Sequence, residues 1–115
     1  MEQIVAEKVQ AAIDRLADQE VYLHLETTNG AYASHHNESF FSAGAYIRNA
    51  LVTYVSGKIV GSGPYRVGLK LAIGWVYAEG LTHFELDAEG RLLLAGHDND
   101  GKLAVALEIS PTPFE

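Results

Sequence analysis

Short strand-like runs follow one another through most of this chain, and only one segment has the period of a helix. From residue 21 onward, apolar residues alternate with polar ones or form short runs, and the joins are rich in Gly, Asn and Asp. Parallel neighbours need crossover connections of a dozen or more residues, which such joins do not provide. We therefore predict consecutive antiparallel strands. The expected strands are 21–27, 40–48, 51–60, 65–72, 75–79, 81–86, 91–95 and 102–109.

The N-terminal segment is the one predicted helix. Residues 2–18 place Val5, Val9, Ile13 and Leu16 on one face, at the spacing of an amphipathic helix. A chain of 115 residues fits one domain, so we assign residues 1–115 to a single unit. A flat sheet of so many strands would leave one face uncovered. We therefore expect a mainly β fold, with coiled antiparallel sheets forming a barrel- or sandwich-like core and one N-terminal α-helix.

Several residues predict how the sheets bend and end. Glycines interrupt strand patterns at positions 44, 57, 68 and 74, where a missing side chain permits a bend or bulge. The tail Pro111-Thr112-Pro113-Phe114 cannot continue a ladder of hydrogen bonds. We expect it to lie along the surface, with Phe114 docked or facing a partner. The segment 97–101, His-Asp-Asn-Asp-Gly, is predicted to be a hairpin turn, and His83 a hydrogen-bonded or exposed sheet residue.

Charge and composition narrow the classes of function. The net charge is −7, from 15 acidic and 8 basic residues, so we expect no nucleic-acid partner. Arg48, Lys58, Arg66 and Lys70 could nevertheless form a basic face in the middle third. The chain has no cysteine, which excludes disulfides and thiolate metal sites. We find neither a signal peptide nor an apolar span, so we expect a cytoplasmic location and no membrane association.

Two histidines suggest a metal site. Asn29-Gly30 between alternating runs is a strong signal for a two-residue hairpin, which would place His24 opposite His35 with Glu26 one step along the same face. Two imidazoles and a carboxylate at that separation could hold a divalent metal such as Zn²⁺. The alternative is a solvated polar hairpin face without a metal, and no other cofactor is predicted.

The segment Gly61-Ser62-Gly63-Pro64-Tyr65-Arg66 suggests a second kind of site. Backbone N–H groups of Gly61 and Gly63, with Arg66 beside them, could bind a small anion or a sugar phosphate, and Tyr65 could line the site. The segment is not a P-loop, because it lacks Gly-Lys-Ser/Thr and a following helix. A plain bend between strands is the alternative.

Aromatic and arginine residues of the central strands suggest an interaction surface. Trp75 and other aromatic residues lie near Arg48 and Arg66 along the chain, and such residues are common in interfaces and sugar-binding platforms. They could equally fill the core or a sheet edge. We find no complete catalytic set, so we expect a non-catalytic accessory or binding module that could form a homo-oligomer, with an unknown protein or small molecule as partner. A metal-dependent enzyme and an anion binder are the alternatives.

The chain also resembles a known family. The segments VYLHLETTNGAY, AYIRNA, GPYRVGLK, GWVYAEGLT, LLLAGH and GKLAVALEIS are similar to the YojF family, a group of uncharacterised proteins from Bacillus-type bacteria. The resemblance implies a mostly β fold of bifurcated, coiled sheets and no established activity. Genes of this family often neighbour a deacetylase used to make the thiol bacillithiol, which suggests a role beside that enzyme. Without cysteine, this chain could not itself exchange thiols.

Overall fold

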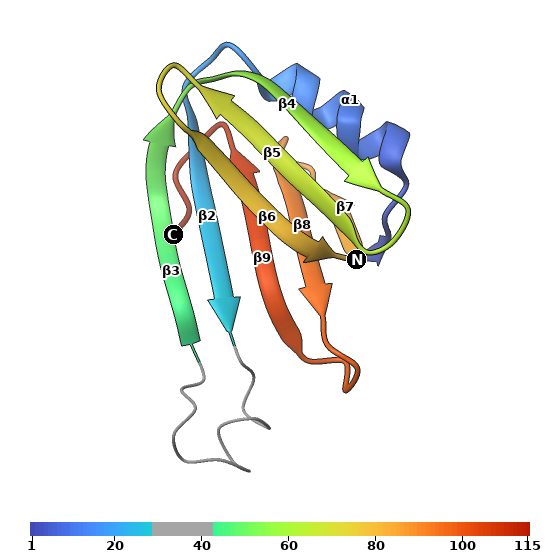
Figure 1. Ribbon diagram of the computed structural model, residues 1–115. Coiled ribbons are helices and arrows are strands. Elements are labelled where there is room, and N and C mark those ends of the chain that lie inside the picture. The colour runs from blue at the N-terminus through green and yellow to red at the C-terminus, as the bar shows by residue number, and fades with distance from the viewer. Residues whose placement is uncertain (29–42) are drawn as a thin grey trace.

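The computed structural model describes residues 1–28 and 43–115, which form one helix and nine strands (Figure 1). All strand pairs in this part of the chain are antiparallel, as predicted. The described residues contain no helix long and apolar enough to cross a membrane. The elements are β1 (Glu2–Gln3), α1 (Ala6–Leu16), β2 (Val21–Thr28), β3 (Ala43–Val52), β4 (Tyr54–Gly61), β5 (Tyr65–Leu71), β6 (Trp75–Leu81), β7 (His83–Leu86), β8 (Leu92–His97) and β9 (Leu103–Ser110).

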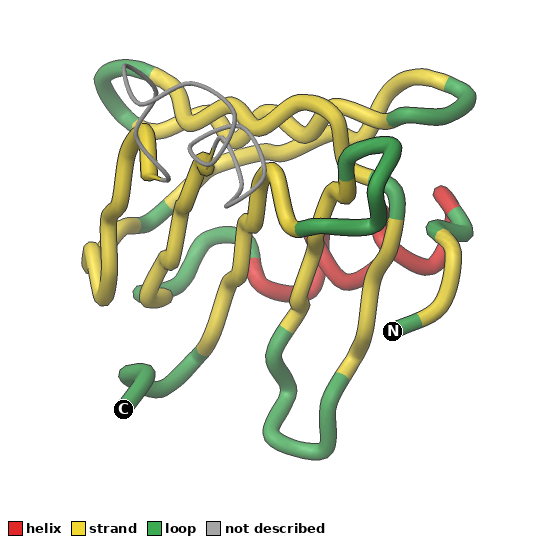
Figure 2. The backbone as a smooth tube through the Cα atoms, turned by 90° about the horizontal axis from the view of Figure 1, so that it is seen from below, coloured by secondary structure: helices red, strands yellow, loops and turns green. Residues whose placement is uncertain are grey.

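The strands form two separate sheets that pack as layers. The six-stranded sheet has the order β1-β7-β8-β9-β2-β3, and the three-stranded sheet has the order β4-β5-β6. The chain crosses from one sheet to the other at Thr53, between β3 and β4, and at Thr82, between β6 and β7. Viewed from below, the sheets are distinct layers with the helix beside them (Figure 2). Of the two predicted cores, the sandwich-like one is confirmed, because the sheets do not close into a barrel.

Strand alternation places the core between the layers. In β5, Val67 and Leu69 are fully buried, while Arg66 and Lys70 are exposed on the outer face of the three-stranded sheet. Burial of apolar side chains from both sheets and the helix is the main stabilising contribution. The largest fully buried side chains are Tyr54, Phe84, Ile13, Leu16, Leu69, Leu81, Leu92, Leu94, Leu107, Ile109, Val9 and Val21.

The helix is shorter than the predicted 2–18. It covers Ala6–Leu16, because residues 2–3 are extended and pair with β7 as the edge strand β1. The helix packs along β4, and its Gln10 side chain completes that edge strand. The Gln10 amide donates to the carbonyl of Gly57 at 2.9 Å and accepts from the N–H of Ile59 at 3.0 Å. Such pairing satisfies backbone groups that an uncovered edge would leave free.

Two hairpins share one turn geometry with the same sequence pattern, Asp-x-x-Gly-Lys/Arg. In segments 87–91 and 98–102, the aspartate Oδ1 accepts the N–H groups two and four residues later, at 2.9–3.0 Å. The glycines of the two turns have φ values of +79° and +77°, a left-handed conformation that favours glycine. The hairpin predicted at 97–101 is confirmed, and its Asp98 carboxylate is part of the turn.

Two glycines bring the sheets into backbone contact. A Cβ atom at Gly96 in β8 would overlap the carbonyl oxygen of Gly80 in β6 and would lie 2.7 Å from Val105 Cγ1. Next to this contact, the N–H of Thr82 donates to the carbonyl of Ala95 at 2.9 Å. The missing side chain at Gly96 therefore allows β8 to approach the junction between β6 and β7. His97 is thereby held close to Thr82.

Candidate functional site

The predicted metal site joins His24 and Glu26 of β2 to His35. The ladder partners of His24 are Arg48 in β3 and Glu108 in β9. At His24, both edges of β2 are therefore occupied by other strands. A longer connection joins β2 to β3 than the expected two-residue turn, since Thr28 pairs with Ala43. His35 itself lies outside the described residues.

His24 is buried in a polar cluster that uses both of its ring nitrogens. It is 5% exposed, its Nε2 lies 3.0 Å from Glu26 Oε1, and Arg48 Nη1 lies 3.2 Å from its Nδ1. A guanidinium can only donate, so Nδ1 accepts and the proton on Nε2 is donated to Glu26. Metal binding at Nδ1 would have to displace Arg48. In the described part of the chain, no three His, Cys, Asp or Glu side chains are grouped so as to hold a metal.

The C-terminal tail covers this cluster. Phe114 is buried against the protein, which is one of its two predicted positions. The guanidinium carbon of Arg48 lies 4.9 Å from the centroid of its ring, and that of Arg91 lies 5.2 Å from it. Asn49 holds its backbone, donating to the Phe114 carbonyl at 2.8 Å and accepting the Phe114 N–H at 2.7 Å. Asn49 has φ +56° at a bulge in β3, which aims its side chain at the tail. His24 is thus closed off from solvent.

The predicted ligand residues of the segment 61–66 border two different hollows. Gly63 and Tyr65 line a cleft at one end of the sandwich. Arg66 points to the outer face of the three-stranded sheet, where its Nη1 lies 3.7 Å from Glu79 Oε1. Gly61, Arg66 and again Tyr65 border a smaller hollow of about 260 Å³. Both glycines have positive φ, +108° and +118°, so they form the predicted bend between β4 and β5.

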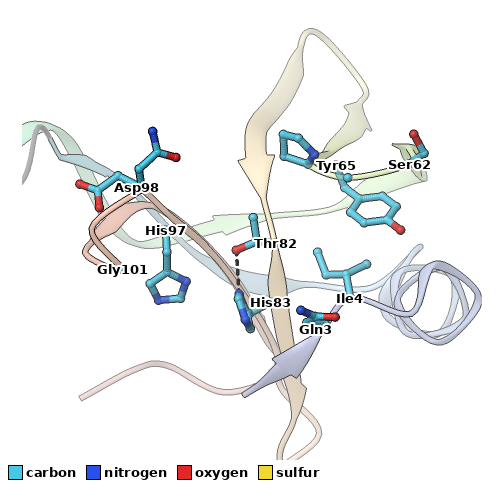
Figure 3. A pocket seen from close by; sticks show the side chains of 12 residues that line it. Gln3, Ile4, Ser62, Tyr65, Thr82, His83, His97, Asp98 and Gly101 are labelled. Carbon is cyan, nitrogen blue, oxygen red and sulfur yellow. Dashed lines mark hydrogen bonds between the residues drawn. The ribbon is translucent and has the colours of Figure 1, made fainter.

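The cleft lies at one end of the sandwich, where four elements meet. Its volume is about 740 Å³, and its walls come from β1, the β4–β5 turn, the β6–β7 junction and the β8–β9 turn. In Figure 3, Tyr65 and Ser62 lie on one side and His97 and Asp98 on the other, with Thr82 and His83 between them. An adjoining hollow of about 650 Å³ shares Thr82 and His97 with it.

Two imidazoles and a hydroxyl are the reactive groups of this cleft. The rings of His83 and His97 are 5.0 Å apart at their centroids and nearly perpendicular, at 85°. Thr82 Oγ1 lies 2.7 Å from His83 Nδ1 and 3.4 Å from the carbonyl oxygen of Ala95. If the hydroxyl donates to that carbonyl, His83 Nδ1 donates to the hydroxyl and His83 Nε2 is left as an acceptor.

His97 carries an unpaired buried nitrogen at the same place. Its Nδ1 is the one buried side-chain nitrogen or oxygen without a hydrogen-bond partner among the described residues. Such a group is destabilising unless something else satisfies it. The nearby Asp98 does not pair with it, and its Oδ1 accepts two backbone N–H groups of its own turn. The cleft therefore offers hydrogen-bonding imidazoles to a polar ligand.

The other predicted surface residues lie elsewhere. Trp75 is exposed on the outer face of the three-stranded sheet, stacked on Tyr77 at 5.5 Å, while Arg48 is on the edge strand of the six-stranded sheet. Sequence reasoning did not foresee the contact of His83 with His97. The two residues are on adjacent strands, and their approach depends on the register of β7 with β8, which no local pattern indicates.

Comparison with known proteins agrees with this architecture. Residues 3–114 match a family model described as "Protein of unknown function (DUF1806)". The uncharacterized protein YojF of Bacillus subtilis (strain 168) is 58% identical over 114 residues, covering 99% of this chain and 98% of that protein. The crystal structure of the Bacillus subtilis YojF protein is similar, with a TM-score of 0.86 and 54% identity over 99% of this chain and 96% of that chain.

Proposed function

Since this chain belongs to the DUF1806 family, whose function is unknown, we propose from its own geometry that it is a non-catalytic module that binds a small polar molecule in the end cleft. The observation that carries the proposal is the buried, unpaired Nδ1 of His97 beside a cleft of about 740 Å³. A ligand donor or a bound water that paired this nitrogen would remove the free-energy cost of leaving it unsatisfied.

Three features of the cleft support binding of a small molecule. Its volume is within the range of about 300–1,000 Å³ that is usual for ligand sites. Its walls combine the apolar Ile4 with the polar side chains of Gln3, Ser62 and Thr82. Its position is fixed by the backbone contact of Gly80 with Gly96, which joins the two sheets at that end. A prearranged site loses less conformational entropy when it binds.

The arrangement favours binding over catalysis. A Thr–His pair can serve as nucleophile and base only when the hydroxyl proton points to the imidazole. Thr82 Oγ1 has a second acceptor, the Ala95 carbonyl at 3.4 Å, and the Asp98 carboxylate that could orient His97 is engaged in its turn. These contacts leave the imidazoles as hydrogen-bonding groups for a ligand.

A thermal-shift screen tests the proposal. We would screen polar metabolites without a phosphate group, including sugars and, because of the family resemblance, thiol precursors. A ligand present at 100 times its Kd should stabilise the protein by about 2.7 kcal/mol. The stabilisation should disappear in His97→Ala and in His83→Ala, and should persist in Leu86→Ala, which changes an exposed side chain on β7. Hits that stabilise His97→Ala and the unmodified protein equally would refute the proposed site.

A further inference from the structure

The outer face of the three-stranded sheet carries a second group of side chains suited to a ligand. We call it the basic-aromatic face and define it by Lys58, Arg66, Lys70, Trp75 and Tyr77. These residues lie on β4, β5 and β6, and their side chains reach solvent. The face holds three of the chain's 8 basic residues, although the chain as a whole has a net charge of −7. Positive charge is therefore concentrated on this face.

The three cations surround a position without a side chain. Gly68 is the ladder partner of Lys58 on one side and of Tyr77 on the other. Arg66 and Lys70 flank it along β5, two residues away in each direction. Cross-strand neighbours have Cβ atoms about 5 Å apart, and positions two apart along a strand are separated by about 7 Å. The Tyr77 ring lies over Gly68 itself, and the long side chains of Lys58 and Arg66 line the groove beside that ring, where they can reach one small anion.

Contacts within the protein neutralise the charges of these three side chains only weakly. Arg66 has one ion pair, with Glu79 at 3.7 Å, and both side chains are more than half exposed. Exposed pairs of this kind contribute little to stability. Lys70 Nζ lies 5.8 Å from the centre of the Trp75 ring, and the Lys58 side chain makes no hydrogen bond or ion pair with any residue that the structure places. The positive charge is available to a ligand.

The two aromatic rings form a shelf beside the cations. Trp75 and Tyr77 are 53% and 54% exposed, and their planes are within 10° of parallel at a centroid distance of 5.5 Å. Rings in face-to-face contact are about 3.5–4 Å apart, so this pair is offset and part of each ring is uncovered. A Cβ at Gly68 would lie 2.8 Å from Tyr77 Cε1, so the glycine allows Tyr77 to lie against the sheet.

We propose that the basic-aromatic face binds a small phosphorylated molecule that carries a sugar or base ring. The phosphate would lie in the groove beside Tyr77, between Lys58 and Arg66, and the ring would contact Trp75 and Tyr77. The groove there has a volume of about 450 Å³ and shares no lining residue with the end cleft. The inference is independent of the proposed function.

Electrostatics favour a small ligand over a nucleic-acid strand. At physiological salt, charges more than about 8 Å apart are largely screened, so a small phosphate responds mainly to the three nearby cations. A long polyanion would also pass over the rest of a chain whose net charge is −7. Affinity for a polymer grows with the number of phosphates that are neutralised, and the described face offers three cations.

Trp75 supplies a direct measurement, because it is the single tryptophan of the sequence. We would titrate the full chain with glucose 6-phosphate, AMP and inorganic phosphate, and follow the tryptophan fluorescence with correction for absorbance. The expected result is a saturable change with at least one ring compound, with an affinity at least tenfold above that for inorganic phosphate. Comparison of the two ring compounds identifies the ring that is recognised. Tighter binding of glucose 6-phosphate indicates a sugar ring, and tighter binding of AMP indicates a base.

Charge substitutions complete the test. Lys58→Gln and Arg66→Gln should each weaken binding about tenfold, whereas Lys8→Gln, a matched change on the exposed face of α1, should leave it unchanged. Circular dichroism would show that each variant is folded. The proposal is overturned if neither ring compound gives a saturable change, or if the two face variants bind as tightly as the unmodified protein. It is also overturned if inorganic phosphate binds as tightly as the ring compounds, or if a single-stranded oligonucleotide binds more tightly than AMP.

Discussion

Gly96→Ala is a change of one methyl group that should separate the two sheets locally. The new Cβ would overlap the Gly80 carbonyl oxygen and lie 2.9 Å from the Gly80 carbonyl carbon. Both atoms belong to the backbone of the other sheet, so no rotamer change can remove the overlap. Overpacking costs about 1–3 kcal/mol, and a backbone obstacle places this variant at the upper end, at about 3 kcal/mol. In a domain of this size, that corresponds to a Tm lower by about 12 °C.

Urea unfolding measures this loss, with Gly101→Ala as the control. Gly101 has φ +77°, and a Cβ there would meet no heavy atom within 4 Å, so alanine costs only the strain of a left-handed conformation, about 1–2 kcal/mol. Gly96 has no positive φ, so its cost would be steric. A Gly96→Ala variant that loses no more stability than Gly101→Ala would refute the close approach of the sheets.

Three further changes test the surroundings of the core. Tyr54→Phe removes a buried donor to the Ile13 carbonyl at 2.6 Å and should cost about 1–3 kcal/mol in urea unfolding. Burial, aided by Asp14, raises the pKa of Tyr54 well above its usual value, so the unmodified protein should lose stability as the pH rises above about 10, and the variant should lose less. An equal loss of stability in the two proteins as the pH rises would contradict this expectation. Phe114→Ala should cost about 2 kcal/mol and expose His24 to chemical modification; a protected His24 would contradict the tail's role. Asp98→Ala should speed hydrogen exchange of the two turn amides that it accepts, and unchanged exchange would refute the turn assignment.

The fold was largely predictable because the local signals agree with it. The period of two in β2 and in β5 marks the buried faces, and the pattern Asp-x-x-Gly sets two of the turns. The absence of a second helical pattern favoured antiparallel pairing. The placement of β9 beside β2 was not predictable, since it joins strands that are far apart along the chain. The strand β1 was missed because a pair of residues carries no periodic signal.

The candidate site was only partly predictable. Gly63 and Tyr65 of the glycine-rich segment do line the cleft, and positive φ explains why glycine is needed there. The predicted metal site assumed a tight turn after Thr28. The ladder partners of His24 in the structure are Arg48 and Glu108. The ring contact of His83 with His97 depends on the register of β7 with β8. Tertiary contacts of this kind have no counterpart in local sequence.

The most direct test of the central claim uses the histidines themselves. Side-chain ¹⁵N resonances would be recorded for the labelled chain while polar fragments are added one at a time. Ligands of the end cleft should shift the signals of His83 and His97, and should leave unchanged those of His24, whose ring nitrogens are bonded to Glu26 and Arg48. Fragments that bind while perturbing His24 alone, or a screen in which neither cleft histidine responds, would contradict the account.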